Sequence, residues 1–368
     1  MTLSDNSPTM VSSDAKSPSD TGTADKQFRQ DPSNRLVLFG VRLPLLRSAS
    51  ILLALVIALT LPFFLKGFQV FQLTQVIYLS IAVLGLNILT GYNGQFSLGH
   101  SAFMAFGAYT AAILMSHMQI GYVWTIPIAG LTCFVAGFLF GLPASRLEGI
   151  YLALATFALA TAVPQLLRHD DLEHWTGGVQ GISLDGVETP LQFLTDDQWL
   201  YFFSLAIGAL LLIAALNLVR SRFGRAMLAI RDNPIAAATM GVNIPMVKSL
   251  TFGLSGLYCG IAGALSAIVV EYVAPESYTF LHAILLLIAM VVGGVASIPG
   301  VILGAMFILY APSFSENVVD TVFDGDPSSK ALVWVAFGVF LILTVHLMPN
   351  GAAGLVKSFV RRFAKPSK

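Results

Sequence analysis

The chain has 368 residues, of which 56% are hydrophobic and only 11% charged, and its 20 Lys and Arg balance 20 Asp and Glu. Soluble domains usually carry about a quarter charged residues. Repeated apolar runs of bilayer-spanning length therefore favour an integral membrane protein over a soluble protein with an unusually large core. The zero net charge gives no indication of nucleic-acid binding.

The first segment, residues 1–34, is rich in Ser, Asp, Thr, Pro and Lys and has little to bury. We expect it to be a disordered cytoplasmic tail. It lacks the apolar region of a cleaved signal peptide, so sorting to the membrane would depend on the first spanning helix. A transmembrane domain is expected over 35–350, with a cytoplasmic loop over 220–248, and a basic cytoplasmic tail over 351–368.

Ten apolar runs follow the tail, several of them interrupted by Gly or Pro. The pattern predicts an all-α integral membrane protein, a polytopic helical bundle of about ten spans with broken or re-entrant segments. The run from Val301 to Ala311 is short, which indicates either a crossing or a re-entrant half-helix buried against protein or water. The runs are Ser48–Leu65, Val70–Leu89, Leu98–Met115, Val123–Phe140, Gly149–Leu167, Trp199–Leu218, Leu250–Val270, Leu281–Ala296, Val301–Ala311 and Ala331–Met348.

Charge divides the connecting segments into two groups. The N-terminal tail, the segment 220–248 and the C-terminus are basic, whereas the loops 168–197 and 313–330 are acidic. With ten crossings, all basic segments fall on one side of the membrane and both acidic loops on the other. Because basic loops remain cytoplasmic, this pattern predicts that both termini are cytoplasmic.

The glycines and the two cysteines of the apolar runs predict helix packing rather than a catalytic or metal-binding role. Four glycines at spacings of three, four and three residues share one face of the seventh run, where they would let helices approach closely. They are Gly253, Gly256, Gly260 and Gly263, and Gly137 and Gly141 form another small pair. Cys133 and Cys259 both lie inside apolar runs, so we interpret them as small buried hydrophobes.

The basic loop contains the stretch GRAMLAIRDNPIAAATMGVNIPMVKS, residues 224–249. Asn233 and Pro234 predict a helix start, since Asn caps well and Pro suits the first helical position. Gly241 sits where a left-handed residue is expected after a helix end. The result would be a short capped element that presents Ala236, Ala237 and Ala238. It could dock into a partner's groove or lie on lipid headgroups.

Polar residues mark the end of the second run. In GYNGQFSLGH, residues 91–100, the glycines surround Asn93, Gln95 and Ser97, and the segment is either a broken helix entry lining a translocation path or a tight cytoplasmic turn. Asn87 is a further pore candidate, with an interhelical hydrogen bond as its alternative. His100 and His282 receive no role, because a lone histidine in an apolar run is more often structural.

Four blocks carry a family resemblance: residues 91–114, 176–182, 224–248 and 291–305. In this order they resemble the LivM-type permease subunits of ATP-driven branched-chain amino acid importers, over about 70–350. The resemblance implies that the capped element is a coupling helix that docks on an ATP-binding subunit. The residues it assigns to that contact are Arg225, Arg231, Asp232, Asn233, Pro234, Ala236, Ala237 and Gly241.

The same resemblance implies a multi-pass permease in the bacterial inner membrane, among lipid, without a role in nucleic-acid binding. Its expected partners are a second homologous permease, two ATP-binding subunits and a periplasmic substrate-binding protein. No GxxxxGK[ST] loop and no catalytic constellation occurs in the sequence, so the chain is not expected to be an enzyme, and ATP and Mg should be bound by the partner ATPases.

The substrate class implied is branched-chain or other small amino acids, with urea as the alternative inside the family. A self-sufficient secondary carrier is the alternative from another class. Carriers coupled to protons or sodium usually place charged groups at the midplane of the membrane, and no Asp, Glu, Lys or Arg lies deep inside the runs. This scarcity favours an external energy source.

Overall fold

The computed structural model describes residues 35–38, 41–190, 193–322, 330–348 and 351–354. The predicted tail 1–34 and most of the basic C-terminal tail lie outside these residues. The chain divides into two compact units, Met1–Leu61 and Pro62–Lys368. In the first unit, β1 (Arg35–Leu38) and β2 (Val41–Pro44) form an antiparallel pair that leads into α1 (Leu45–Phe64).

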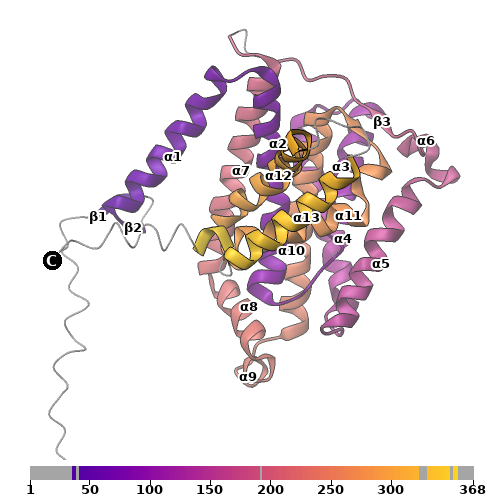
Figure 1. Cartoon of the computed structure of the whole chain (residues 1–368). Helices are drawn as coiled ribbons and strands as arrows, with labels where there is room; N and C mark the ends of the chain where they lie inside the picture. The colour runs from indigo at the N-terminus through magenta and orange to yellow at the C-terminus, as the bar shows by residue number, and fades with distance from the viewer. Residues whose placement is uncertain (1–34, 39–40, 191–192, 323–329, 349–350, 355–368) are drawn as a thin grey trace, which may run out of the picture. The chain divides into compact units, whose positions relative to one another are not determined.

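The second unit is a helical bundle (Figure 1). Two two-residue strands, β3 (Ile182–Ser183) and β4 (Tyr272–Val273), pair antiparallel. The longer helices are α2 (Gly67–Leu86), α3 (His100–Ser116), α4 (Tyr122–Ala144), α5 (Ile150–Leu167), α7 (Asp196–Arg220), α8 (Arg222–Asp232), α10 (Ile244–Val270), α11 (Phe280–Gly293), α12 (Gly300–Val322) and α13 (Lys330–Leu347). The short ones are the π-helix η2 (Asn87–Tyr92), the 3-10 helices η3 (Asp170–Leu172) and η4 (Pro275–Tyr278), and the α-helices α6 (Glu173–Thr176) and α9 (Pro234–Thr239).

Each of the ten predicted apolar runs contains a helix, which confirms the all-helical membrane class. Within the described residues, six helices are long and apolar enough to cross a bilayer, the longest of them α10 with 27 residues. By contrast, α11 has 14 residues and a length of about 21 Å, short of the roughly 30 Å hydrocarbon core. The short run Val301–Ala311 extends into the 23-residue helix α12, which contains Pro312 and is one of these six.

The centre of the bundle is α10. In its most apolar window 83% of the residues are buried, against 17% in α7. Its predicted glycine face packs on two neighbours: a Cβ on Gly256 would lie 2.6 Å from the carbonyl oxygen of Cys133 in α4, and one on Gly263 would meet the carbonyl oxygen of Met104 in α3. Since a side chain at these positions would push the helices apart, the glycines set the close packing. Cys133 and Cys259 are free and buried, as expected.

The turn between α11 and α12 is closed by glycines of the fourth sequence block. A Cβ on Gly293 would meet the carbonyl oxygen of Gly300, and Gly294 adopts φ +113°. Ala296 has φ +57°, a conformation that costs free energy in a residue other than glycine, and Ser297 and Ile298 beside it are buried. Contacts with residues outside the turn must therefore offset the free-energy cost of this backbone conformation.

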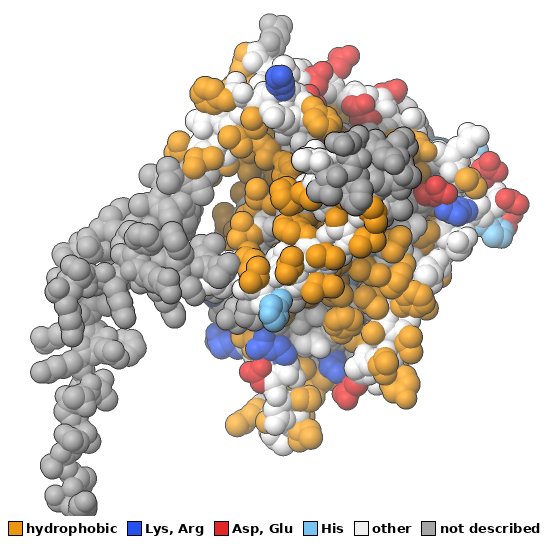
Figure 2. All heavy atoms as spheres, in the orientation of Figure 1, with side chains coloured by type: hydrophobic (Ala, Val, Ile, Leu, Met, Phe, Trp, Pro, Cys, Tyr) orange, Lys and Arg blue, Asp and Glu red, His pale blue; other side chains and the backbone are white. Residues whose placement is uncertain are grey.

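Charged side chains gather at opposite ends of this unit (Figure 2). Asp and Glu side chains are frequent at the end where α7 begins and β3 lies, and Arg and Lys at the end that carries α8 and α9. The broad surface between the two ends is largely hydrophobic in this view. This arrangement is expected of a protein whose middle region lies in the lipid bilayer while its two ends face water.

Candidate functional site

The basic end of the bundle carries a polar segment made of α8, α9 and the C-cap residue Met240, here called the α8–α9 segment (residues 222–240). Ser221 caps α8 by accepting a hydrogen bond from the amide of Gly224. Asn233 caps α9 by accepting one of 3.0 Å from the amide of Ala236, and Pro234 occupies the first turn. Gly241 follows the helix end with φ +82°. The local prediction for Asn233, Pro234 and Gly241 is confirmed.

Exposure within α9 differs from the predicted surface of small residues. Ala236 and Ala238 are exposed, but Ala237 is 3% exposed and packs inward, which corrects its predicted place on the surface. The most prominent groups are Ile235, 78% exposed, and Met240, 87% exposed. These two apolar side chains at the tip were missed by sequence reasoning because a six-residue helix is too short to show which face is covered. They form the strongest candidate docking surface on this segment.

The predicted contact residues Arg225 and Arg231 have different surroundings. Arg225 is exposed and donates a hydrogen bond of 3.2 Å to the carbonyl oxygen of Arg220, the last residue of α7. Arg231 turns toward the bundle, where its Nη1 donates a hydrogen bond of 2.8 Å to the carbonyl oxygen of Gly91. Its Nη2 also lies 3.1 Å from Oδ1 of Asp232. Arg231 therefore links the α8–α9 segment to η2.

Next to η2 lies the polar link, residues 93–99, which begins at the C-cap residue Asn93 and has no helix or strand from 94 to 99. Asn93, Gln95 and Ser97 are at most 3% exposed. Asn93 Nδ2 donates to Gln95 Oε1 at 2.6 Å, while Asn93 Oδ1 and Gln95 Nε2 have no hydrogen-bond partner. Exchanging the O and N positions of both amides would still leave one donor and one acceptor unused. Buried polar groups normally have partners, so this pair is a candidate point of solute contact.

Ser97 is engaged differently from the two amides. Its Oγ lies 3.0 Å from Nδ1 of His100, and Nε2 of the same ring lies 2.6 Å from Oγ of Ser255, whose hydroxyl donates to the carbonyl oxygen of Gly85. Because the Ser255 proton is used on Gly85, Nε2 of His100 must be the donor. His100 therefore connects the end of the polar link to α10 and, through Ser255, to α2.

Asn87 lies at the start of η2 and is fully buried. Its Nδ2 donates to the carbonyl oxygen of Ser297 at 3.1 Å, and its Oδ1 accepts from the amide of Ala296 at 2.8 Å. The structure contains the hydrogen bond that was the alternative to a pore role, formed here with the turn between α11 and α12; the pore role stays a prediction. By bonding these two backbone groups, Asn87 stabilises the left-handed conformation of Ala296 in the α11–α12 turn.

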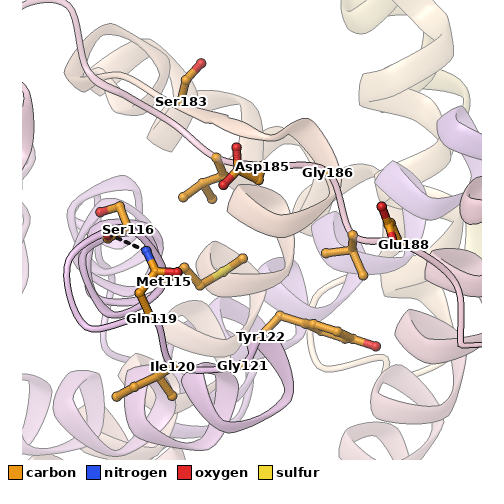
Figure 3. Close-up of a pocket in the computed structure, with 12 residues that line it drawn as sticks. Met115, Ser116, Gln119, Ile120, Gly121, Tyr122, Ser183, Asp185, Gly186 and Glu188 are labelled. Atoms are coloured by element: carbon orange, nitrogen blue, oxygen red, sulfur yellow. Dashed lines mark hydrogen bonds between the residues drawn. The ribbon is translucent and has the colours of Figure 1, made fainter.

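The acidic end contains a cavity of about 490 Å³ between the α3–α4 turn and the loop that follows β3 (Figure 3). Its walls include Ser116, Tyr122 and the carboxylate side chains of Asp185 and Glu188. Within the described residues neither carboxylate takes part in an ion pair. The loop itself is held in place, since the amide of Leu184 donates to the carbonyl oxygen of Glu271 at 2.8 Å. This surface would attract a basic partner.

No group of three or more His, Cys, Asp and Glu within the described residues is placed to hold a metal ion. What the structure does show is long apolar helices, charges of opposite sign at the two ends, and buried polar breaks between them. Together these features define a multi-pass helical membrane protein.

The family model described as "Branched-chain amino acid transport system / permease component" matches residues 69–345. The chain is 32% identical to the permease protein LivM of Escherichia coli strain K12 over 326 residues, 81% of this chain and 76% of that protein. Against LivM of Salmonella typhimurium the identity is 34%, covering 69% of this chain and 65% of that protein. LivH of Escherichia coli is 24% identical, covering 75% and 91%. The chain belongs to this permease family and is of the LivM type.

Proposed function

We propose that the chain is the membrane permease subunit of an ATP-driven importer of branched-chain or other small amino acids in the bacterial inner membrane. It would pair with a second permease of the LivH kind, since the relatives include both LivM and LivH proteins of one transport system. ATP and Mg would be bound by two ATPase subunits. A soluble binding protein would deliver the solute.

The observation that carries this proposal is the capped α8–α9 segment with its exposed apolar tip. Ile235 and Met240 are more than three-quarters exposed at the end of a helix that is held rigid by the Asn233 cap. Exposed apolar groups on a preorganised element are typical of docking surfaces. Arg225 and Asp232, both exposed on α8, would supply charges for orientation. Closure of the ATPases would move this segment and shift the bundle between two states.

The orientation follows from charge. The basic end, with α8 and α9, would face the cytoplasm together with both termini, and the acidic end would face outward. The cavity beside Asp185 and Glu188 would then receive the binding protein through basic side chains. Asn93 and Gln95, which lie beside Arg231 of the α8–α9 segment, would contact the solute. Ser97 would hold the polar link in place, and Asn87 would hold the α11–α12 turn.

The decisive experiment is affinity purification of the tagged chain from native membranes, in parallel with an Ile235→Glu, Met240→Glu double variant. Two ATP-binding subunits and a second permease should accompany the parent chain, and the double variant should lose the ATPases while keeping the permease. A binding protein that accompanies them should then bind leucine, isoleucine or valine in calorimetry; binding of urea would reassign the substrate. A parent chain that transports solute in liposomes alone and without ATP would be a secondary carrier.

A further inference from the structure

Arg231 connects the α8–α9 segment to η2. It lies in the last turn of α8, two residues before the cap of α9, yet its guanidinium reaches η2. Nε and Nη2 donate to Asp232 Oδ1 at 3.2 and 3.1 Å, while Nη1 donates to the Gly91 carbonyl oxygen at 2.8 Å. A charged donor makes a stronger hydrogen bond than a neutral one, and the planar guanidinium aims several donors at once.

The carbonyl oxygen of Gly91 is available because the helix ends there. After η2 the amide of Gly94 still donates to Thr90, four residues back, but that of Gln95 donates to Leu89, six residues back, so regular helix bonding ends at Gly94. Gly94 adopts φ +73°, and a Cβ on it would lie 2.8 Å from Cγ of Arg231. The turn is thus shaped around the arginine side chain, which packs on the backbone immediately between Asn93 and Gln95.

η2 is also held from its other end. Asn87, its first residue, is bound to Ala296 and Ser297 through both halves of its amide. A Cβ on Gly91 would lie 2.7 Å from the amide nitrogen of Ala296, so the π-helix and the α11–α12 turn are in direct contact. π-helical turns are frequent at functional sites. η2 is contacted from both sides, by Arg231 at its end and by the α11–α12 turn at Asn87 and Gly91.

We propose that Arg231 is a positioning residue for transport, which holds the end of η2 and the adjoining polar link in one arrangement and moves them when the α8–α9 segment moves. The unused donor and acceptor of the Asn93–Gln95 pair would be withheld from the solute in one arrangement and offered to it in the other. A zwitterionic amino acid carries both complementary groups. This inference rests on the proposed function, because it takes the movement of the α8–α9 segment from the ATPase partners.

The test uses the complete importer reconstituted in proteoliposomes, with Arg231→Gln and Gly94→Ala as independent variants. Arg231→Gln removes the charge-assisted hydrogen bond, whereas Gly94→Ala displaces the arginine without altering it. Arg222→Lys and Gly338→Ala are the matched controls, since Arg222 is exposed in the first turn of α8 and a Cβ on Gly338 would meet nothing within 4 Å. Retained ATPase subunits, ATP hydrolysis and leucine uptake are measured for each.

Both test variants should keep their ATPase subunits and hydrolyse ATP within about twofold of the parent, while uptake per ATP falls about tenfold, the scale of one lost charge-assisted hydrogen bond. Arg231→Lys should recover part of the loss. An Asn93→Cys chain should react with a membrane-impermeant maleimide faster or slower with ATP than without it. That nucleotide dependence should vanish when Arg231→Gln is added. The buried native Cys133 and Cys259 supply the background rate.

Unchanged uptake per ATP in both variants, with the nucleotide dependence of maleimide labelling in the Asn93→Cys chain retained, would overturn the inference. Loss of the ATPase subunits from Arg231→Gln alone would also overturn it, because Arg231 would then be a partner contact rather than an internal link. A parent chain that retains no ATPase would refute the proposed function itself, and with it the source of the movement. If Arg231→Gln does not reach the membrane, the result for Gly94→Ala decides.

Discussion

The side-chain amide of Asn87 donates a hydrogen bond of 3.1 Å to the carbonyl oxygen of Ser297, 210 residues further along the chain. The same amide accepts from the backbone nitrogen of Ala296, a non-glycine residue with φ +57°. One fully buried side chain thus satisfies two backbone groups of a strained turn. The conformation of the turn between α11 and α12 therefore depends on the first residue of η2, which is distant in the sequence.

Replacement of Asn87 by alanine should therefore destabilise the protein strongly. Two buried backbone groups would lose their partners, at a cost of about 2–5 kcal/mol in the free energy of unfolding. Thermal unfolding in detergent, followed by tryptophan fluorescence, measures the effect. Asn317→Ala is the control, because Asn317 is exposed on α12. Equal melting temperatures for the two variants would show that the turn is stable without Asn87.

The exposed tip of α9 should matter for assembly and not for folding. Ile235→Glu should weaken retention of the ATPase subunits at least tenfold, as expected for an apolar residue at the centre of an interface. The melting temperature of the isolated chain should stay within about 1 °C, because surface substitutions rarely change stability by more than a few tenths of a kcal/mol. Met118→Glu, at a side chain 56% exposed beyond α3, is the matched control and should retain the ATPases. Equal retention in both variants would remove the tip from the coupling site.

The Asn233 cap should stabilise α9 locally. Asn233→Ala removes the acceptor for the Ala236 amide and should cost about 1 kcal/mol of helix stability. Hydrogen exchange measured by mass spectrometry should then be about fivefold faster in residues 236–240, while α10 remains protected. Asn233→Ser, which keeps an acceptor, should restore slow exchange. Unaltered exchange in Asn233→Ala would mean that packing, and not the cap, holds α9.

The glycine face of α10 should tolerate no side chain at Gly260, where it packs on α4. A Cβ on Gly260 would lie 2.5 Å from Cβ of Cys133 and 2.7 Å from the carbonyl oxygen of Ala129. Gly260→Ala should lower the free energy of unfolding by about 1–3 kcal/mol through overpacking. Gly338→Ala, which has open space, should be neutral. The difference between their melting temperatures checks the argument, and no difference would indicate that α4 can shift freely.

Topology is tested by a cysteine at Asp185, an exposed residue of the acidic loop. In intact cells an impermeant maleimide should label it from outside, and a cysteine at the exposed position Thr239 should react only in inverted vesicles. The reason is that basic segments remain on the cytoplasmic side. Reversed labelling of the two positions would invert the orientation and place the α8–α9 segment outside, away from any ATPase.

Local sequence patterns were sufficient to predict the helical membrane class, the ten apolar helices and the capped start of α9 at Asn233 and Pro234. These features depend on local composition and on contacts within a few residues, which periodicity and capping rules describe. The glycine face of α10 was also predictable, because helical spacing places its members together whatever they pack against. The length of α12 could not be predicted, because its second half is polar and does not appear as an apolar run.

The contacts of the polar side chains, by contrast, became known only from the tertiary structure. Arg231 bonds to Gly91, 140 residues away, and Asn87 bonds to the turn at Ser297. Neither bond tests the predicted partner contact of Arg231 or the predicted pore position of Asn87, which stay predictions. The outward position of Ile235 and the inward position of Ala237 depend on how α9 packs beneath the bundle. Long-range hydrogen bonds and burial are set by which helices become neighbours, and a single sequence does not encode that choice in any local pattern.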